Sequence, residues 1–282
     1  MYRKQVVLVA TVLVLGAVLA SGQTRKELRY KVHRRATISI MNPYGPIFVK
    51  PNPNKEIVII AILHSDKVEI DPNQRGSRID VVSHLLAGAD PDSGRVDYEL
   101  LVPVDANVTL HSTTGPLHAE RLRGDVIMEG NTANVDVRDL TEGHVHIRTL
   151  NGPVTLTNIS DGHVEVTSVS GNVALKSVNG PFVQVSSTSG MISYDGDFGG
   201  GGEYSLMTHT GDILATAPSY ASIEVVARSE QGKVENDFLL EPGHSSFVAR
   251  AGSAFAGTIN KAASSVKLLS FSGKIHLKKR QN

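Results

Sequence analysis

The chain has 282 residues, with 28 Lys and Arg residues against 28 Asp and Glu residues, so its formal net charge at pH 7 is zero. Nucleic acid and anionic lipid both attract proteins through a concentrated basic surface, and this balance therefore disfavours them as partners. The absence of cysteine excludes disulfide bonds and lipid modification of an N-terminal cysteine.

Residues 1–22 predict a secretory signal peptide. Two basic residues precede an apolar run over 6–20, and small residues at 20–22 fit a cleavage site. The run is short for a membrane span, although an uncleaved anchor is the alternative. No second apolar segment of this kind occurs later in the sequence. We therefore expect a periplasmic or secreted mature chain that begins at Gln23, with no membrane span after signal removal.

Residues 23–107 are less regular than the remainder but carry β patterns. Gly45 has an alternating apolar pair on each side, which predicts a first coil of two strands. Longer apolar strands are expected at 57–63, 78–82 and 96–102. No Pro/Gly/Ser linker separates this part from the rest of the chain. We interpret 23–107 as an N-terminal β cap that merges into solenoid repeats at 108–282.

The repeats share a motif of the form hydroxyl-x-x-Gly-x-aliphatic-x-aliphatic, which is clearest at 149–156, 168–175 and 187–194. A period near 20 residues is typical of a solenoid, whose coils bury apolar surface by stacking. We predict an all-β fold, a single-chain β-solenoid (β-helix-like) with coils of ~19 residues. The turn position is occupied by Gly115, Ala133, Gly152, Gly171, Gly190, Gly211, Gly232 and Gly273, with steps of 18, 19, 19, 19, 21, 21 and 41, the last corresponding to two coils.

Apolar residues lie at constant offsets from the turn position: five and seven residues before it, and two and four residues after it. Because side chains alternate across a strand, each pair should point inward. A further aliphatic, seven residues after the turn, precedes a second corner with Gly, where we expect Gly to supply a positive φ. The inward set includes Val145/Ile147, Val164/Val166, Val183/Val185, Tyr204/Leu206, Val154/Leu156, Val173/Leu175 and Ile192/Tyr194, with Leu122, Leu140, Ile159 and Val178 at the second corner.

The position three before each turn residue forms a column that is mostly hydroxyl-bearing. It could be a polar binding stripe or a ladder that hydrogen-bonds the turn backbone. We favour the ladder, because a bend repeated in every coil needs its backbone groups satisfied. The column reads Ser112, Gly130, Thr149, Ser168, Ser187, Thr208, Ser229 and Ser270.

One column could hold a metal ion. Asp125, His144 and His163 each lie eight residues before a turn position, and stacked coils would place them ~4.8 Å apart. A carboxylate and two imidazoles can bind zinc. A run of exposed polar turn residues explains the same column, and we favour that interpretation, so no residue is assigned as a metal ligand.

Other motifs that could indicate a metal, cofactor or catalytic site lack residues that such a site requires. The segment Asp90-Pro91-Asp92-Ser93-Gly94 is similar to the start of a calcium loop but lacks the later acidic ligands. No nucleophile or nucleotide motif is present, and Trp is absent. We therefore predict no catalytic or cofactor-binding residues, no cofactor, and no enzyme activity. The outward column five after the turn mixes both signs of charge instead of pairing acids as a glycosidase does: Glu120, Arg138, Thr157, Lys176 and Asp195.

Four segments together resemble the bacterial putative-adhesin β-strand-repeat family, a domain of unknown function. They are Thr188-Ser189-Gly190-Met191-Ile192, Phe271-Ser272-Gly273-Lys274-Ile275, Ile38-Ser39-Ile40-Met41-Asn42 and Tyr98-Glu99-Leu100-Leu101-Val102-Pro103. The resemblance covers nearly the whole mature chain and implies an extracytoplasmic β-solenoid. It defines no functional residues.

Three functions fit this sequence. The first is an extracytoplasmic, adhesin-like binding or scaffold protein, whose partner would be an envelope protein or a polysaccharide. The second is a β-helix carbohydrate-active enzyme, which would need acids that converge in the folded chain. The third is an envelope element that associates end to end through exposed terminal strands. We favour the first, because the chain carries a signal and repeats but no catalytic set.

Overall fold

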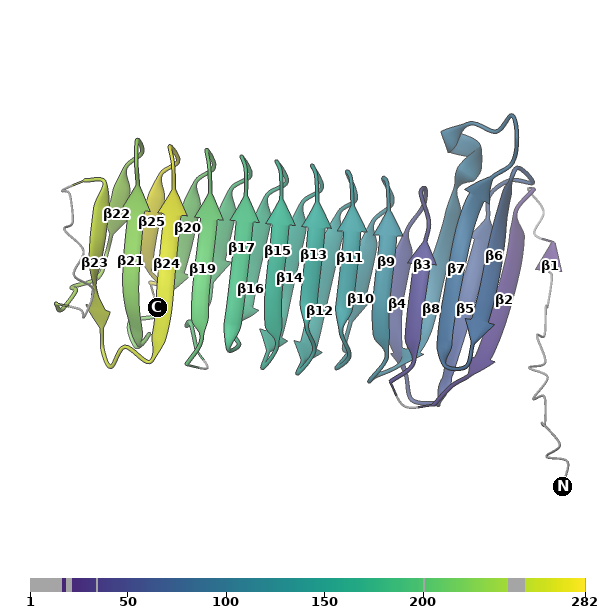
Figure 1. The fold of residues 1–282 in the computed structure, drawn as a ribbon, viewed down its shortest axis with the longest axis horizontal. Helices are drawn as coiled ribbons and strands as arrows, with labels where there is room; N and C mark the ends of the chain where they lie inside the picture. The colour runs from purple at the N-terminus through teal and green to yellow at the C-terminus, as the bar shows by residue number, and fades with distance from the viewer. Residues whose placement is uncertain (1–16, 19–21, 34, 200, 243–251, 282) are drawn as a thin grey trace, which may run out of the picture.

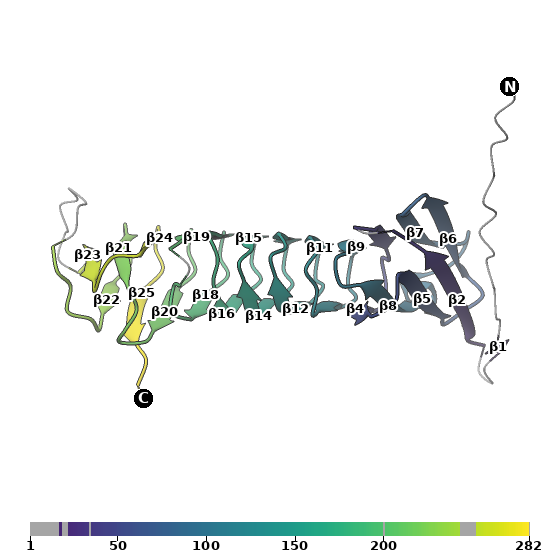
Figure 2. The same ribbon diagram turned by 90° about the horizontal axis from the view of Figure 1, so that it is seen from below.

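Each regular coil of the chain contains two short strands, because its two alternating apolar pairs are separated by a turn. The computed structural model describes residues 17–18, 22–33, 35–199, 201–242 and 252–281. The first strand of a coil joins a 12-stranded sheet and the second joins a 13-stranded sheet. The two sheets face each other along an elongated body, with the strands running across its long axis (Figures 1 and 2). The predicted all-β solenoid is confirmed.

We call each two-stranded coil a row. Neighbouring regular rows pair in parallel with a constant register, such as Val145 opposite Val164 and Val164 opposite Val183. The regular rows are β9 (Asn107–Ser112) with β10 (Leu117–Glu120), β11 (Val126–Gly130) with β12 (Val135–Thr141), β13 (Val145–Thr149) with β14 (Val154–Ser160), β15 (His163–Ser168) with β16 (Val173–Val178), β17 (Phe182–Ser187) with β18 (Ile192–Asp195), and β19 (Glu203–Thr208) with β20 (Ile213–Ala217).

The core lies between the two sheets and consists of the apolar side chains that the alternation predicts to point inward. All of the pairs named above are buried, as are the four aliphatic residues at the second corner. The side chains that alternate with the inward ones along each strand, such as Thr155 and Thr167, are accessible to solvent. The predicted inward and outward faces are therefore confirmed for every regular row.

Glycine is required at both corners of a row because neighbouring rows stack closely there. Among the turn positions in the described ranges, only Gly45 has a positive φ. At Gly171 an added Cβ would lie 2.0 Å from the carbonyl oxygen of Gly152, one row below. The second corner repeats this, with 2.1 Å from Gly162 to the oxygen of Gly143. The expectation of positive φ at the second-corner glycines is wrong, since none of them has a positive φ. Glycine is needed at both corners because the backbones of neighbouring rows stack too closely to leave space for a side chain.

The left-handed residues of the second corner are not glycines. Asp139 and Asn158 both have φ of 55°, and Glu142 has φ of 67°. At the turn that carries Ala133 in place of glycine, the following Asn134 has no positive φ either. In this row the small residues have changed places: glycine, Gly130, is at the hydroxyl position, and Ala133 is at the turn position. A Cβ on Gly130 would lie 2.8 Å from the Cβ of Ala133, so the alanine methyl occupies the space that a hydroxyl side chain fills in other rows.

The hydroxyl column forms the predicted ladder. Gly190 N donates to Ser187 Oγ at 2.9 Å, and Gly273 N donates to Ser270 Oγ at 2.8 Å. Ser168 Oγ donates to the carbonyl oxygen of Gly171 at 2.8 Å. These side chains are buried and close their own turns. Ser112 is the exception, because its buried Oγ has no hydrogen-bond partner.

At the N-terminal end, spatial order departs from chain order. The row of β3 (Thr37–Met41) and β4 (Ile47–Asn52) lies between the row of β9 and β10 and the row of β7 (Arg78–Leu85) and β8 (Val96–Pro103). The 3-10 helix η1 (Pro91–Gly94) connects β7 to β8. Beyond them, β5 (Glu56–Leu63) and β6 (Val68–Arg75) pair antiparallel with β8 and β7. β2 (Thr24–Lys31) then pairs antiparallel with β5.

The predicted signal peptide lies mostly outside the described residues. Within it the structure describes Gly22 and β1 (Ala17–Val18), which pairs antiparallel with β2. Within the ranges that the structure describes, no helix is long and apolar enough to span a membrane.

At the C-terminal end the chain turns back and inserts a row. β24 (Ser264–Ser270) lies between β19 and β21 (Ile223–Ser229), and β25 (Ile275–Lys279) lies between β20 and β22 (Val234–Asn236). β23 (Ala254–Ile259) covers β21 as an antiparallel edge strand. In Figure 1 the yellow β24 stands between the greener β19 and β21. The 41-residue step to Gly273 is therefore not two coils outward, since Gly273 stacks directly on Gly211.

Candidate functional site

A groove of about 540 Å³ lies on the outer face of the 12-stranded sheet. It runs across the strands, from the row of β3 to the row of β15, beside the hydroxyl-x-x-Gly turns. Met41 and Pro43 lie at one end and Leu150 and Val169 at the other. We call this hollow the turn groove.

The turn groove exists because side-chain size changes from row to row at two outward positions. Thr113 and Asn131 present short side chains in the middle rows. Larger apolar side chains rise at the ends: Met41 is 48% exposed, Leu150 48% and Val169 43%. Single exposed apolar side chains are common on protein surfaces, whereas adjacent ones, such as Leu150 and Val169, can mark an interaction surface.

A charged line crosses the groove along the outward column of the sheet. Register places Met41, His111, Glu129 and Arg148 in successive rows. His111 Nδ1 lies 3.2 Å from Glu129 Oε2, whereas Arg148 Nη1 lies 3.9 Å from Glu129 Oε1. The Arg148 side chain is 63% exposed. Glu129 is thus bonded mainly to His111, and most of the guanidinium of Arg148 remains open to a ligand.

The backbone at the floor of the groove is already satisfied. Asn131 N donates to the carbonyl oxygen of Ser112, and Leu150 N donates to that of Gly130. Each turn is tied in this way to the row below, so these amides are not free to pair with an added strand. The groups that the turn groove leaves open to contact are therefore side chains.

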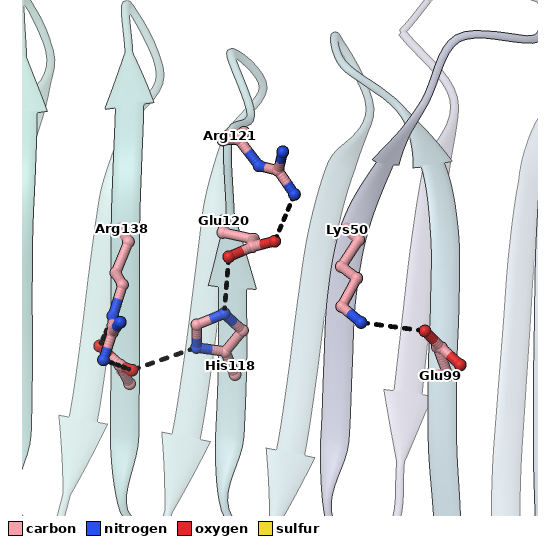
Figure 3. A network of polar contacts seen from close by, with 7 residues as sticks. Lys50, Glu99, His118, Glu120, Arg121 and Arg138 are labelled. Atoms are coloured by element: carbon pink, nitrogen blue, oxygen red, sulfur yellow. Dashed lines mark hydrogen bonds and ion pairs between the residues drawn. The ribbon is translucent and has the colours of Figure 1, made fainter.

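A second polar cluster lies on the outer face of the other sheet, centred on His118 of β10 (Figure 3). Its Nδ1 is 3.2 Å from Asp136 Oδ2 and its Nε2 is 3.4 Å from Glu120 Oε2. Arg138 bonds Asp136 at 2.8 Å, and Arg121 bonds Glu120. The hydrogen bond from Arg121 lowers the pKa of Glu120 more than partial burial raises it, and His118 lowers it further.

This His118 cluster is closed on itself. Both carboxylates point at one imidazole and each is also held by a guanidinium, so neither faces an open cleft as the acids of a glycosidase do. Lys50 and Glu99, which Figure 3 shows beside the cluster, pair with each other at 3.1 Å. Of the mixed-charge column, Glu120 and Arg138 belong to this cluster, and Asp195 pairs with Arg280.

The structure brings together Asp125, His144 and His163, the column that could have held a metal ion, in a geometry that does not suit one. The rings of His144 and His163 stack 4.7 Å apart at an interplanar angle of 1°. Asp125 Oδ1 accepts a hydrogen bond from the backbone N of His144 at 3.0 Å. Lone pairs of parallel rings lie in separate planes, so they do not converge on one ion. In the described ranges no three His, Cys, Asp or Glu side chains are arranged to hold a metal ion.

The segment that is similar to a calcium loop forms the start of η1. Asp90 is its N-cap, and its Oδ1 accepts from Ser93 N at 2.8 Å. This carboxylate therefore has a local role in closing the turn. It occupies none of the lining positions of the turn groove.

Sequence reasoning did not find the turn groove. Part of its signal is in the repeats, because Leu150 and Val169 occupy the same exposed turn position in successive coils. The remaining wall is not readable from the period. Met41 and Pro43 come from a row that lies about 70 residues earlier in the chain than its neighbour β9.

The family model Toastrack DUF4097 matches residues 36–278. Two solved structures are similar over 91% of this chain. One, a putative adhesin from Bacteroides fragilis NCTC 9343, is 12% identical, covered over 97% of its length, with a TM-score of 0.48. The other, a putative cell adhesion protein from Clostridium sporogenes ATCC 15579, is 11% identical, covered over 100%, with a TM-score of 0.29. A search of curated proteins finds no match.

Proposed function

The chain belongs to the Toastrack DUF4097 family, and from that premise we propose that it is an extracytoplasmic binding or scaffold protein whose recognition surface is the turn groove. The observation that carries the proposal is the groove itself, with exposed apolar side chains at both ends and a weakly paired arginine between them. A few such anchors can supply most of the affinity of an interface.

The chemistry of the groove favours a protein partner over a polysaccharide. Its walls are aliphatic or thioether side chains, Met41, Leu150 and Val169, and no Phe, Tyr or Trp ring lines it for stacking on a sugar. The open guanidinium of Arg148 suits a carboxylate, which it can bind through two parallel hydrogen bonds. We therefore expect the partner to present apolar side chains near an acidic group.

A capture experiment tests this proposal. The mature protein is immobilised, an envelope extract is passed over it, and bound proteins are quantified. Leu150→Glu and Arg148→Glu should each reduce capture of the partner roughly tenfold, a loss of about 1.4 kcal/mol in binding. Met191→Glu is the matched control, because Met191 is 42% exposed but does not line the groove. Equal capture by all three variants would disprove the role of the groove.

We also propose that the protein has no catalytic activity. The acids of the His118 cluster are held by arginines, and this supports the proposal. The mature protein should be silent when it is assayed against polysaccharides, peptides and esters. Turnover of a polysaccharide that is abolished by Glu120→Gln would instead establish the carbohydrate-active alternative.

The extracytoplasmic location rests on the signal predicted over residues 1–22. Fractionation of cells that express the chain should place it in the envelope or the medium, and N-terminal sequencing should begin at Gln23. A full-length chain in the cytoplasm would contradict both parts of this proposal.

A further inference from the structure

The inserted row of β24 and β25 is held on both sides. β24 pairs in parallel with β19 over Glu203–Thr208 and with β21 over Ile223–Ser229. β25 likewise pairs with β20 and with β22. Within the described chain, β19 and β21 do not pair with each other. In the sheet they are connected by hydrogen bonds only through β24. The row therefore fills a slot between two rows that precede it in sequence.

The slot holds this row by the same devices that hold every other row. Ser270 Oγ donates to the carbonyl oxygen of Gly211, and Ser229 Oγ donates to that of Gly273. Charged pairs add to this on the outer face, with Lys274 Nζ 2.7 Å from Glu235 Oε2. None of these contacts depends on the covalent connection between the slot and the row.

An empty slot would be unstable. Val266, Leu268, Ile275 and Leu277 of the inserted row are buried in the core. Without them the core would open to water, and β19, β20, β21 and β22 would each present an unpaired edge. Exposed edges of this kind pair readily with other chains. The slot must therefore be filled, either by its own row or by an identical one.

The connection into the row is short and conformationally strained. Residues 260–263 link β23 to β24, and both Asn260 and Ala262 have left-handed backbones, with φ of 55° and 53°. A left-handed alanine costs energy that a different path of the chain would release. Ser222 Oγ holds the connection in place by accepting from Lys261 N and Ala263 N.

We infer that two copies of this chain exchange their inserted rows, so that residues 264–279 of each copy fill the slot of the other. Exchange of an identical element creates no new type of contact and is a low-cost route to a dimer. Dilute protein should keep its own row, because the short connection gives it a high effective concentration. Exchange is expected when chains fold together at high concentration. This mode differs from end-to-end stacking, because the exchanged row lies inside the sheets.

Engineered disulfides report the exchange directly, because the chain has no cysteine of its own. Thr216 and Lys278 are register partners on the outer face of β20 and β25. Parallel neighbours lie ~4.8 Å apart, within the range that a disulfide can span. Thr157 and Lys176 form the matched control pair, since they are the same residue types in the same column of two regular rows.

Each double-cysteine variant is refolded at high concentration, oxidised, separated by size-exclusion chromatography, and run on a non-reducing denaturing gel. Dimers of T216C/K278C should migrate at twice the monomer mass, because each disulfide joins two chains. Dimers of T157C/K176C should fall apart to monomers, because that disulfide stays within one chain. If T216C/K278C folds poorly, Leu214 and His276 are the neighbouring register pair and serve the same purpose.

The inference is overturned if no dimer forms at any refolding concentration, or if T216C/K278C dimers separate into monomers on the non-reducing gel. The turn groove lies in other rows than the slot. Capture of a partner by the groove and exchange of the inserted row are therefore independent results.

Discussion

In the rows from β9 to β20, neighbours in space are neighbours in sequence, whereas at both ends they are not. The row of β3 and β4 and the row of β24 and β25 each lie between two rows that the chain forms elsewhere. The row of β24 and β25 nevertheless has the same turn, the same hydroxyl ladder and the same inward alternation as the regular rows. The motif therefore specifies the shape of a row but not its place in the stack, because every row offers the same edges to its neighbours.

The largest expected effect comes from a charge placed in the core, which should destabilise the protein equally in a regular row and in the inserted row. Val166 and Leu268 occupy equivalent inward positions of a regular and of the inserted row. Val166→Asp and Leu268→Asp should each cost several kcal/mol of unfolding free energy, because each buries a charge among aliphatic side chains. Thermal unfolding measures the loss.

Thr167→Asp is the control for this pair, because Thr167 faces outward next to Val166 and is exposed. Its melting temperature should stay close to that of the unsubstituted protein. Equal melting temperatures for Val166→Asp and Thr167→Asp would contradict the assignment of faces. A mild effect of Leu268→Asp alone would show that the inserted row contributes less than a regular one.

Restoring the common turn in the row that departs from it should have a smaller effect. Gly130→Ser should destabilise the protein by about 1–3 kcal/mol, because the new Cβ would lie against the methyl of Ala133. Adding Ala133→Gly should recover most of that loss, since the pair then matches the other rows. A double-mutant cycle from denaturant unfolding measures the coupling. Additive effects would mean that the two residues do not share one space.

Removing single hydroxyl groups should distinguish a ladder position whose hydroxyl is hydrogen-bonded from one whose hydroxyl is not. Ser168→Ala should cost about 1 kcal/mol, because Ser168 Oγ donates to Gly171 O. Ser112→Ala should be nearly neutral, because the buried Ser112 Oγ has no partner. Denaturant midpoints of the two variants give the comparison. A larger loss at Ser112 than at Ser168 would contradict the ladder.

Zinc should have the smallest effect. A site filled at 100 times its Kd would add about 2.7 kcal/mol of stability. We expect the melting temperature to rise little, because the stacked rings of His144 and His163 do not converge. His144→Ala is the control. A large rise with zinc that this variant abolishes would establish the metal site.

The sequence was sufficient for the shape of a row and insufficient for contacts between distant rows. The period and the alternation predicted the buried residues from Val145 to Leu206, because both depend on neighbours along one strand. The insertion of β24 could not be predicted, since Gly273 fits above Gly211 as well as it would fit anywhere else. The turn groove could not be predicted either, because Met41 belongs to an inserted row whose position in the stack is not determined by the repeat.

The inserted row also sets the order in which the protein can fold as it is synthesised. Rows from β9 to β20 can form one after another, because each needs only the segment that precedes it. β21 cannot be joined to the stack in this way, because the strand between it and β19 pairs Ser265 with Glu203, 62 residues earlier in the chain. Such non-local pairing forms slowly, and the edges of the neighbouring strands stay unpaired until it has formed. Folding of the C-terminal rows is thus expected to begin only when residues 264–279 have emerged.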